Sequence, residues 1–116
     1  TSYITQRGAE AIYTPEGKEQ VKANIRYYMD NVQILKRALT EFGLRVAGGE
    51  DAPYLWVQAP NGISSWKFFD KLLYEAHIVG TPGIGFGPSG EGYMRFTGFE
   101  KKEDCKEAIY RLRRCL

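Results

Sequence analysis

One apolar stripe constrains the fold of this chain more than any other feature. After Pro15, apolar side chains recur at alternating intervals of four and three residues, at Val21, Ile25, Tyr28, Val32, Leu35, Leu39 and Phe42. This spacing puts them on one face of an α-helix about six turns long. Thr14 suits the N-cap, Pro15 the first helical position, and Gly43 the residue after the helix. The sequence therefore predicts a long amphipathic helix over about residues 15–42.

Such a stripe needs a surface to cover it. A coiled-coil dimer is one solution, but few complementary charge pairs flank the stripe, which favours packing against a sheet of the same chain. The opening residues, TSYITQRGAEAIY, are typical of a helix already under way, and the chain does not begin with Met. We therefore expect a piece cut from a larger protein. Processing of a short natural chain is the alternative.

Shorter elements follow the long helix. LRVAGG predicts a strand and turn, and APYLWVQAP (Ala52–Pro60) predicts a strand that is apolar on both faces and hence buried. Ser64 or Ser65 caps a second helix. The residues that we expect to point inward from it are Trp66, Phe69, Leu72 and Leu73.

The second half of the chain contains further strand and helix patterns. Ile78 and Val79 predict a brief strand, and GYMRFTGF predicts another after a glycine-rich loop. Asp104–Leu116 predicts a last helix, whose inner face consists of Cys105, Ala108, Ile109 and Leu112. The chain of 116 residues suffices for one domain. The order of elements predicts a single α+β domain with a short, mostly antiparallel sheet, the long N-terminal helix and two further helices.

Composition excludes several classes of protein. The net charge of +2 does not predict a nucleic-acid or membrane partner, and no apolar run approaches the roughly 20 residues of a membrane span. Cys105 and Cys115 lie ten residues apart on the last predicted helix, about 15 Å, which is too far for a disulfide. Two free thiols predict a reducing cytoplasm. With one histidine, His77, and no C-x-x-C, no metal site is expected.

The stretch GTPGIGFGPSGEGYMRF (residues 80–96) contains a G-x-G-x-x-G at Gly85, Gly87 and Gly90. A dinucleotide-binding fingerprint needs a helix that opens on these glycines, so that the pyrophosphate meets the helix N-terminus. Here a strand pattern follows instead, and no Gly-Lys-Ser/Thr of a Walker A loop is present. The glycines therefore predict a loop of little bulk, which a ligand or another backbone approaches closely.

Arg95 is the candidate binding residue. The strand after the loop alternates, with Tyr93, Arg95 and Thr97 on one face and Met94 and Phe96 on the other. An arginine on a rigid strand beside an open loop suits two-pronged binding of a carboxylate or phosphate. The alternative is a surface arginine paired with a nearby acid.

Other candidates favour structural roles. Lys67 lies on an amphipathic helix, where we expect an exposed side chain rather than the desolvated amine of a catalytic lysine. His77 ends that helix, where a cation is favoured by the helix dipole. Four aromatic residues suggest base stacking or core packing, of which core packing is favoured: Tyr27, Tyr28, Tyr54 and Trp56.

TPGIGFGPSGEGYMRFTGF resembles the C-terminal signature of the class I/II (fold type I) pyridoxal-phosphate aminotransferases. APYLWVQAPN, SSWKFFDKLL and LTEFGLRVAGGEDAPYLW resemble most the subfamily of LL-diaminopimelate aminotransferases, and the resemblance covers about residues 2–112. It implies that the chain is the C-terminal small domain of such an enzyme, with residues 1–43 as a helical lead-in, and that the parent enzyme is a homodimer.

The resemblance implies roles for several residues. Arg95 matches the arginine that binds the α-carboxylate of amino-acid and 2-oxo-acid substrates, and the pocket is shaped by Pro82, Gly83, Phe86 and Gly87. The Schiff-base lysine and the other main ligands of pyridoxal 5′-phosphate lie upstream in this family, so these residues alone are expected to be inactive. An aminotransferase for another amino acid, a stand-alone carboxylate-binding module and a structural interaction domain are the alternatives.

Overall fold

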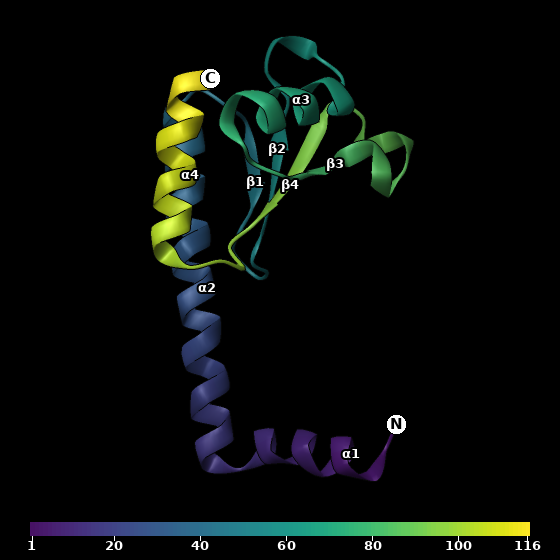
Figure 1. Cartoon of the computed structure of the whole chain (residues 1–116), viewed down its shortest axis with the longest axis vertical. Helices are drawn as coiled ribbons and strands as arrows, with labels where there is room; N and C mark the ends of the chain where they lie inside the picture. Colours follow the sequence, from purple (N-terminus) through teal and green to yellow (C-terminus); the bar gives the residue numbers. More distant parts are fainter.

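Three of the four α-helices cover one face of a four-stranded sheet, and the first helix lies apart from it, in the computed structural model, which describes residues 1–116. The helices are α1 (Tyr3–Glu10), α2 (Pro15–Glu41), α3 (Ser65–Lys71) and α4 (Lys102–Cys115), and the strands are β1 (Val46–Gly48), β2 (Tyr54–Gln58), β3 (Thr81–Pro82) and β4 (Tyr93–Thr97). The strand order is β1-β2-β4-β3, and every neighbouring pair is antiparallel. The predicted α+β class is confirmed (Figure 1).

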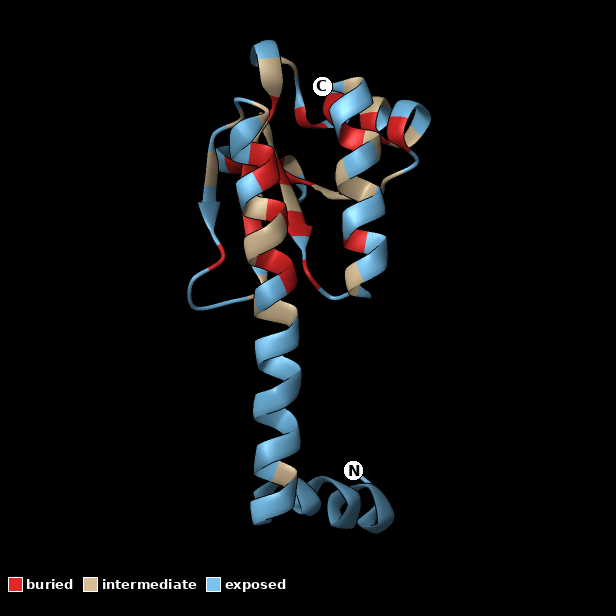
Figure 2. Cartoon of the chain, turned by 90° about the vertical axis from the view of Figure 1, so that its left-hand side faces the viewer, coloured by how far each residue is buried: buried red, intermediate tan, exposed pale blue.

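One face of the sheet packs against helices. Leu55, Val57, Met94 and Phe96 point into this face and are buried. They meet a core to which α2, α3 and α4 and their extensions contribute Val32, Leu35, Leu39, Phe68, Leu72, Cys105 and Leu112. Figure 2 shows the buried residues of α2 confined to the half that lies beside the sheet and α4. That half of the stripe therefore packs within its own chain, as predicted.

The two N-terminal helices are capped by side chains of their own. The hydroxyl of Thr14 accepts a hydrogen bond from the Gly17 N–H (3.0 Å), and α2 begins at Pro15 as predicted. α1 begins at Tyr3, where Ser2 is the N-cap, so the expectation of a helix already under way at Thr1 is wrong. No residue of α1 is buried, and α1 projects sideways at the far end of α2 (Figure 1).

The expectation that β2 is buried on both faces is wrong. Leu55 and Val57 are buried, but Trp56 and Gln58 are half-buried and Tyr54 is 37% exposed. The helices cover only one face of the sheet, so alternate residues of β2 lie on an open face. This open face carries the candidate site described below.

α3 turns a different face inward than predicted. Ser64 is its N-cap, with a hydroxyl that accepts from the Lys67 N–H (3.2 Å). The residues directed at the sheet are Ser65, Phe68 and Leu72, at helical spacing. Phe69 and Leu73 are half-buried, whereas Trp66 is 57% exposed, so its predicted inward position is wrong.

The short edge strand starts later than predicted. His77 adopts the left-handed conformation (φ 54°, ψ 43°) that ends the preceding helical segment. Ile78 and Val79 then belong to no strand, and pairing begins at Thr81, opposite Arg95. The prediction of a strand at Ile78 and Val79 is therefore wrong by three residues.

α4 packs through the predicted face. Cys105 and Leu112 are buried, and Ala108 and Ile109 are half-buried. Both cysteines are free, and burial raises the pKa of the Cys105 thiol and of the Cys115 thiol above the usual range. None of the helices is long and apolar enough to cross a membrane.

Candidate functional site

Arg95 lies on the open face of the sheet, between two aromatic rings. The predicted alternation along β4 is confirmed, because Met94 and Phe96 are buried and Arg95 is not. The guanidinium carbon, Cζ, lies 4.6 Å from the centre of the Tyr54 ring and 4.7 Å from the centre of the Phe86 ring. Both distances are within the range of attraction between a cation and an aromatic face. Tyr54 and Phe86 therefore hold the guanidinium in place.

Arg95 has no acidic partner in this structure. It takes part in none of the salt bridges of the chain. The alternative of a surface arginine paired with a nearby acid is therefore not what the structure contains. Guanidinium N–H groups form a planar fork that matches the two oxygens of a carboxylate. The arrangement can bind such a group without first breaking an ion pair.

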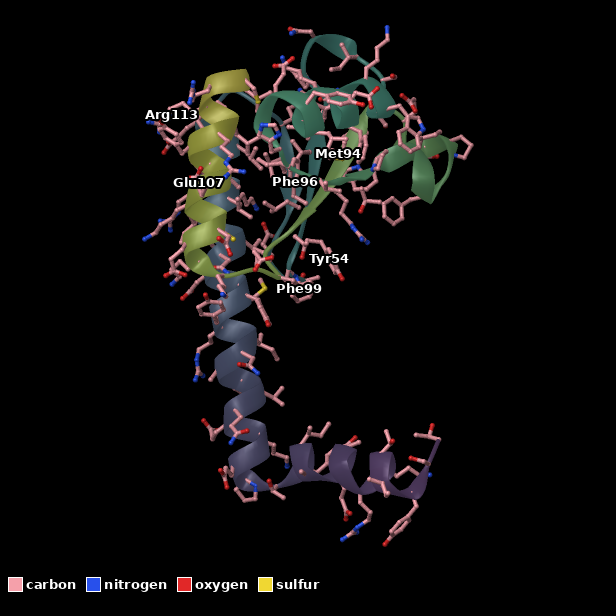
Figure 3. The ribbon with its side chains drawn as sticks, viewed as in Figure 1. Tyr54, Met94, Phe96, Phe99, Glu107 and Arg113 are labelled. Atoms are coloured by element: carbon pink, nitrogen blue, oxygen red, sulfur yellow. The ribbon has the colours of Figure 1, made fainter.

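Further aromatic residues line the open face. Trp56 stacks on Tyr93 (5.6 Å between ring centres, 16° between planes) and meets the edge of Phe86 (5.7 Å). Tyr54 also contacts Phe99 (5.6 Å), and Figure 3 shows these two side chains together at one end of the sheet. Apolar walls lower the local dielectric constant and so strengthen the attraction between Arg95 and an anion.

The expectation of core packing is wrong for most of the aromatic candidates. Tyr54 and Trp56 lie on the open face rather than in the core. Tyr27 is 38% exposed, and its hydroxyl accepts a hydrogen bond from the Lys102 N–H (2.7 Å). Tyr28 is half-buried against the Phe99 ring (5.1 Å). The apolar stripe on α2 predicted the side of the helix but not how far the sheet extends along it.

The glycine loop brings Phe86 to Arg95. Two short 3₁₀ turns, Gly83–Phe86 and Pro88–Gly90, lead directly into β4, so no helix opens on the G-x-G-x-x-G. Pro82 is buried opposite Met94, and Gly83 is buried against the backbone of Gly90.

Gly87 has φ 118°, a conformation that favours glycine, at the turn between the two 3₁₀ segments. Of the four residues predicted to shape the pocket, Phe86 alone touches the guanidinium, and the glycines and Pro82 set the path of the loop.

Sequence reasoning missed two residues near Arg95. Tyr54 supplies one of the two rings at the guanidinium, and the buried Ser65 binds the end of the glycine loop through hydrogen bonds to Gly90, Gly92 and Tyr93. Tyr54 had a signal in the sequence, because it shares the period-two face of Trp56. The sequence signal for Ser65 was ambiguous, because either of the two neighbouring serines, Ser64 or Ser65, suits the N-cap of the helix.

The other candidates lie away from this face. Lys67 is exposed on α3, as predicted. His77 is exposed at the end of the helical segment that follows α3. No group of three or more His, Cys, Asp or Glu side chains is arranged to hold a metal ion.

A cavity of about 260 Å³ lies between the end of β4 and α4. Thr97, Cys105 and Leu112 are among its lining residues, and Arg95 also contributes. Tyr54, Trp56 and Phe86 do not line it, so this cavity adjoins the aromatic surface at Arg95 rather than lying between the two rings that hold the guanidinium.

Known proteins share both this fold and this sequence. Residues 1–112 match the family model "Aminotransferase class I and II". The chain is 68% identical, over its whole length, to 28% of LL-diaminopimelate aminotransferase from Phocaeicola vulgatus. It superimposes on L,L-diaminopimelate aminotransferase from Chlamydomonas reinhardtii with a TM-score of 0.94 at 45% identity, covering 98% of this chain and 28% of that one.

An aminotransferase for another class of substrate shares the fold as well. The aromatic aminotransferase from Pyrococcus horikoshii aligns with a TM-score of 0.85 at 29% identity, over 91% of this chain and 29% of that one. The chain thus spans under a third of the length of the relatives that it matches. The match over residues 1–112, together with the fold, shows that the chain belongs to the class I and II aminotransferases.

Proposed function

We propose that this chain is the substrate-binding, C-terminal part of a pyridoxal-phosphate-dependent aminotransferase that moves an amino group between LL-diaminopimelate and 2-oxoglutarate. The observation that carries the proposal is Arg95, held between Tyr54 and Phe86 with no acidic partner. The LL-diaminopimelate aminotransferases that it resembles supply the substrate. The parent enzyme would act in lysine biosynthesis.

The binding step follows from the geometry of Arg95. Two parallel N–H···O bonds to the α-carboxylate fix both the position and the orientation of an amino acid. Orientation matters because a reacting bond must be aligned before proton transfer is fast. The aromatic rings limit the movement of the guanidinium, so that the ion pair forms in a fixed place.

The residues of this chain do not by themselves fit covalent attachment of pyridoxal phosphate. That cofactor is held in its enzymes by a lysine Schiff base. The lysines here lie on or beside helices, at Lys18, Lys22, Lys36, Lys67, Lys71, Lys101, Lys102 and Lys106, and none is on the open sheet face beside Arg95. We therefore assign cofactor attachment to other parts of the parent enzyme and derive no chemical step from these residues.

We assign the domain arrangement on the same basis. Residues 1–116 would form the small domain, with residues 1–43 as the helical lead-in from the rest of the enzyme. The parent would be a cytoplasmic homodimer, in keeping with the two free thiols.

Two other functions have support from specific observations. Transamination of another amino acid is consistent with the likeness to an aromatic aminotransferase. A stand-alone carboxylate-binding module is consistent with an Arg95 site whose two aromatic walls both come from this chain. Titration of the isolated chain with amino acids and dicarboxylates tests the module, which requires binding that is lost in Arg95→Ala.

The deciding experiment measures turnover in the longer enzyme that contains this chain. With pyridoxal phosphate, LL-diaminopimelate and 2-oxoglutarate supplied, glutamate formation is followed for the wild type and for Arg95→Lys. We expect kcat/KM to fall roughly 10- to 100-fold, because lysine cannot form the two parallel bonds and a charge-assisted hydrogen bond contributes about 1.5–3 kcal/mol. Most of the change should be a higher KM for both substrates.

Arg113→Lys is the matched control. Arg113 also lies over an aromatic ring, that of Phe42 (5.8 Å), but on α4. Equal losses in both variants would contradict the role of Arg95. No turnover, together with a cofactor absorbance that responds to another amino acid, would change the substrate. No uptake of cofactor at all would refute the aminotransferase function.

A further inference from the structure

Ser65 joins the start of α3 to the end of the glycine loop. Its hydroxyl oxygen accepts hydrogen bonds from the N–H groups of Gly92 (2.9 Å) and Tyr93 (3.3 Å). The same hydroxyl donates to the carbonyl oxygen of Gly90 (3.3 Å). A serine hydroxyl has one donor and two acceptor positions, so all three are used here.

The acidic residue of the loop completes this connection. The Glu91 carboxylate accepts from the Ser65 N–H (2.9 Å). This N–H belongs to the first turn of α3, where no helical carbonyl is available and a negative charge is favoured. Four hydrogen bonds therefore link Ser65 to the four residues that end the loop, Gly90 to Tyr93.

Capping of the helix does not account for Ser65. The N-cap is Ser64, whose hydroxyl accepts from the Lys67 N–H (3.2 Å). Ser65 is completely buried, and a buried hydroxyl is costly unless it is hydrogen-bonded. Its bonds reach across 25 to 28 residues of sequence, to the loop rather than to the helix.

The loop in turn sets the surroundings of Arg95. Tyr93, which donates to Ser65, stacks on Trp56, and Trp56 meets Phe86. Phe86 lies 4.7 Å from the guanidinium carbon of Arg95. The loop is also closed on itself, since Gly83 and Gly90 touch through their backbones. A shift of residues 90–93 would therefore move Phe86 and the strand that carries Arg95 together.

We propose that Ser65, with Glu91, is a positioning residue that holds the glycine loop so that Phe86 and Arg95 form one carboxylate site. The inference rests on the proposed function, because it assumes that Arg95 binds a carboxylate. None of the hydrogen bonds of Ser65 reaches Arg95, so Ser65 acts on Arg95 only through the loop.

The test compares two neighbouring serines in the longer, cofactor-loaded enzyme. Ser65→Ala removes the loop bonds, and Ser64→Ala removes the N-cap of the same helix and leaves the loop bonds in place. Glu91→Ala is a second variant that leaves no cavity, because Glu91 is exposed, and Glu91→Gln retains an acceptor for the Ser65 N–H.

Two measurements are made on each variant. Hydrogen exchange followed in peptides covering residues 84–93 reports on the loop without any need for activity. Calorimetric titration with glutarate, a dicarboxylate without amino or oxo groups, and KM and kcat for both substrates report on the site. We expect Ser65→Ala to speed exchange in these peptides and to raise the glutarate Kd and both KM values about tenfold, more than kcat falls.

The controls define the outcomes. Ser64→Ala should lower the Tm but leave loop exchange and glutarate Kd within about twofold of the wild type, and Glu91→Gln should be closer to the wild type than Glu91→Ala. If Ser65→Ala does not fold, Glu91→Ala must show both faster exchange and weaker binding.

If Ser65→Ala speeds exchange but leaves Kd and KM unchanged, the positioning role is overturned, while the role of Arg95 and the proposed function stay intact. Unchanged exchange in Ser65→Ala would also overturn the positioning role. A wild-type enzyme that does not bind glutarate, or binds it equally in Arg95→Lys, would refute the proposed function and this inference with it.

Discussion

At the residue scale, the glycine loop depends on two glycines whose backbones touch. A Cβ on Gly83 would lie 2.1 Å from the carbonyl oxygen of Gly90, and a Cβ on Gly90 would lie 2.0 Å from that of Gly83. Both contacts are with backbone, which has little freedom to move aside. Gly85 differs, because no atom lies within 4 Å of a Cβ built there and its φ is not positive.

Gly83→Ala should therefore destabilise the chain by about 1–3 kcal/mol, the usual range for overpacking. Gly85→Ala, two residues away in the same 3₁₀ turn, should change the free energy of unfolding by no more than about 0.5 kcal/mol. Urea unfolding of the two variants measures the difference. Similar values for both would mean that the close approach of Gly83 and Gly90 is not required for folding.

Single residues of the site differ in how well the sequence predicts them. The period-two pattern of β4 predicts that Arg95 faces away from the core, because that relation is local. Phe86 was assigned to the pocket of Arg95 only through the family resemblance, and Tyr54 was not assigned to it at all, because strand register and the path of the loop bring both rings there. Ser65 was ambiguous for a similar reason, since its partners lie on the distant loop.

At the element scale, the apolar stripe of α2 divides into two parts. Val32, Leu35 and Leu39 are buried against the sheet and α4, whereas Val21 is 39% and Ile25 55% exposed. The stripe predicted which face of the helix is apolar, and this is confirmed where α2 meets the sheet. Its periodicity contained no information on where the sheet ends, so the division could not be predicted.

Substitutions along α2 should follow this division. Leu39→Ala removes a fully buried side chain and should cost about 2–5 kcal/mol. Ile25→Ala removes an exposed one and should stay within about 0.5 kcal/mol in the isolated chain. Urea unfolding at low protein concentration compares them. A large loss for Ile25→Ala would contradict the structure and indicate that the first half of α2 is covered.

Strand positions were predicted less well than helix positions. α2 and α4 lie within two residues of their predicted starts, because their periodic apolar patterns are long and Thr14 caps α2. β3 is only two residues long, and the apolar pair Ile78 and Val79 predicted it too early. A strand this short depends on its neighbour β4 more than on its own composition.

At the scale of the whole molecule, the chain is too extended for a compact domain. Its radius of gyration is 16.8 Å, whereas a compact domain of this size has about 13 Å. The difference comes from α1 and the first half of α2, which project from the layered part (Figure 1). Several large apolar residues are exposed on this projection: Tyr3, Ile4, Ile12, Tyr13, Val21 and Ile25.

Hydrogen exchange should therefore divide the isolated chain in two. An eight-residue helix without buried side chains, such as α1, is marginal in water, so amides of residues 3–24 should exchange close to the unfolded rate. Amides from Val32 to Leu39 and in β2 and β4 should be protected, because they surround the core. In the longer aminotransferase, residues 3–24 should become protected, since the apolar projection then has a surface to cover it. If instead the protection of residues 3–24 in the isolated chain increases with protein concentration, copies of the chain associate through the exposed half of the stripe. That behaviour is expected of an interaction domain.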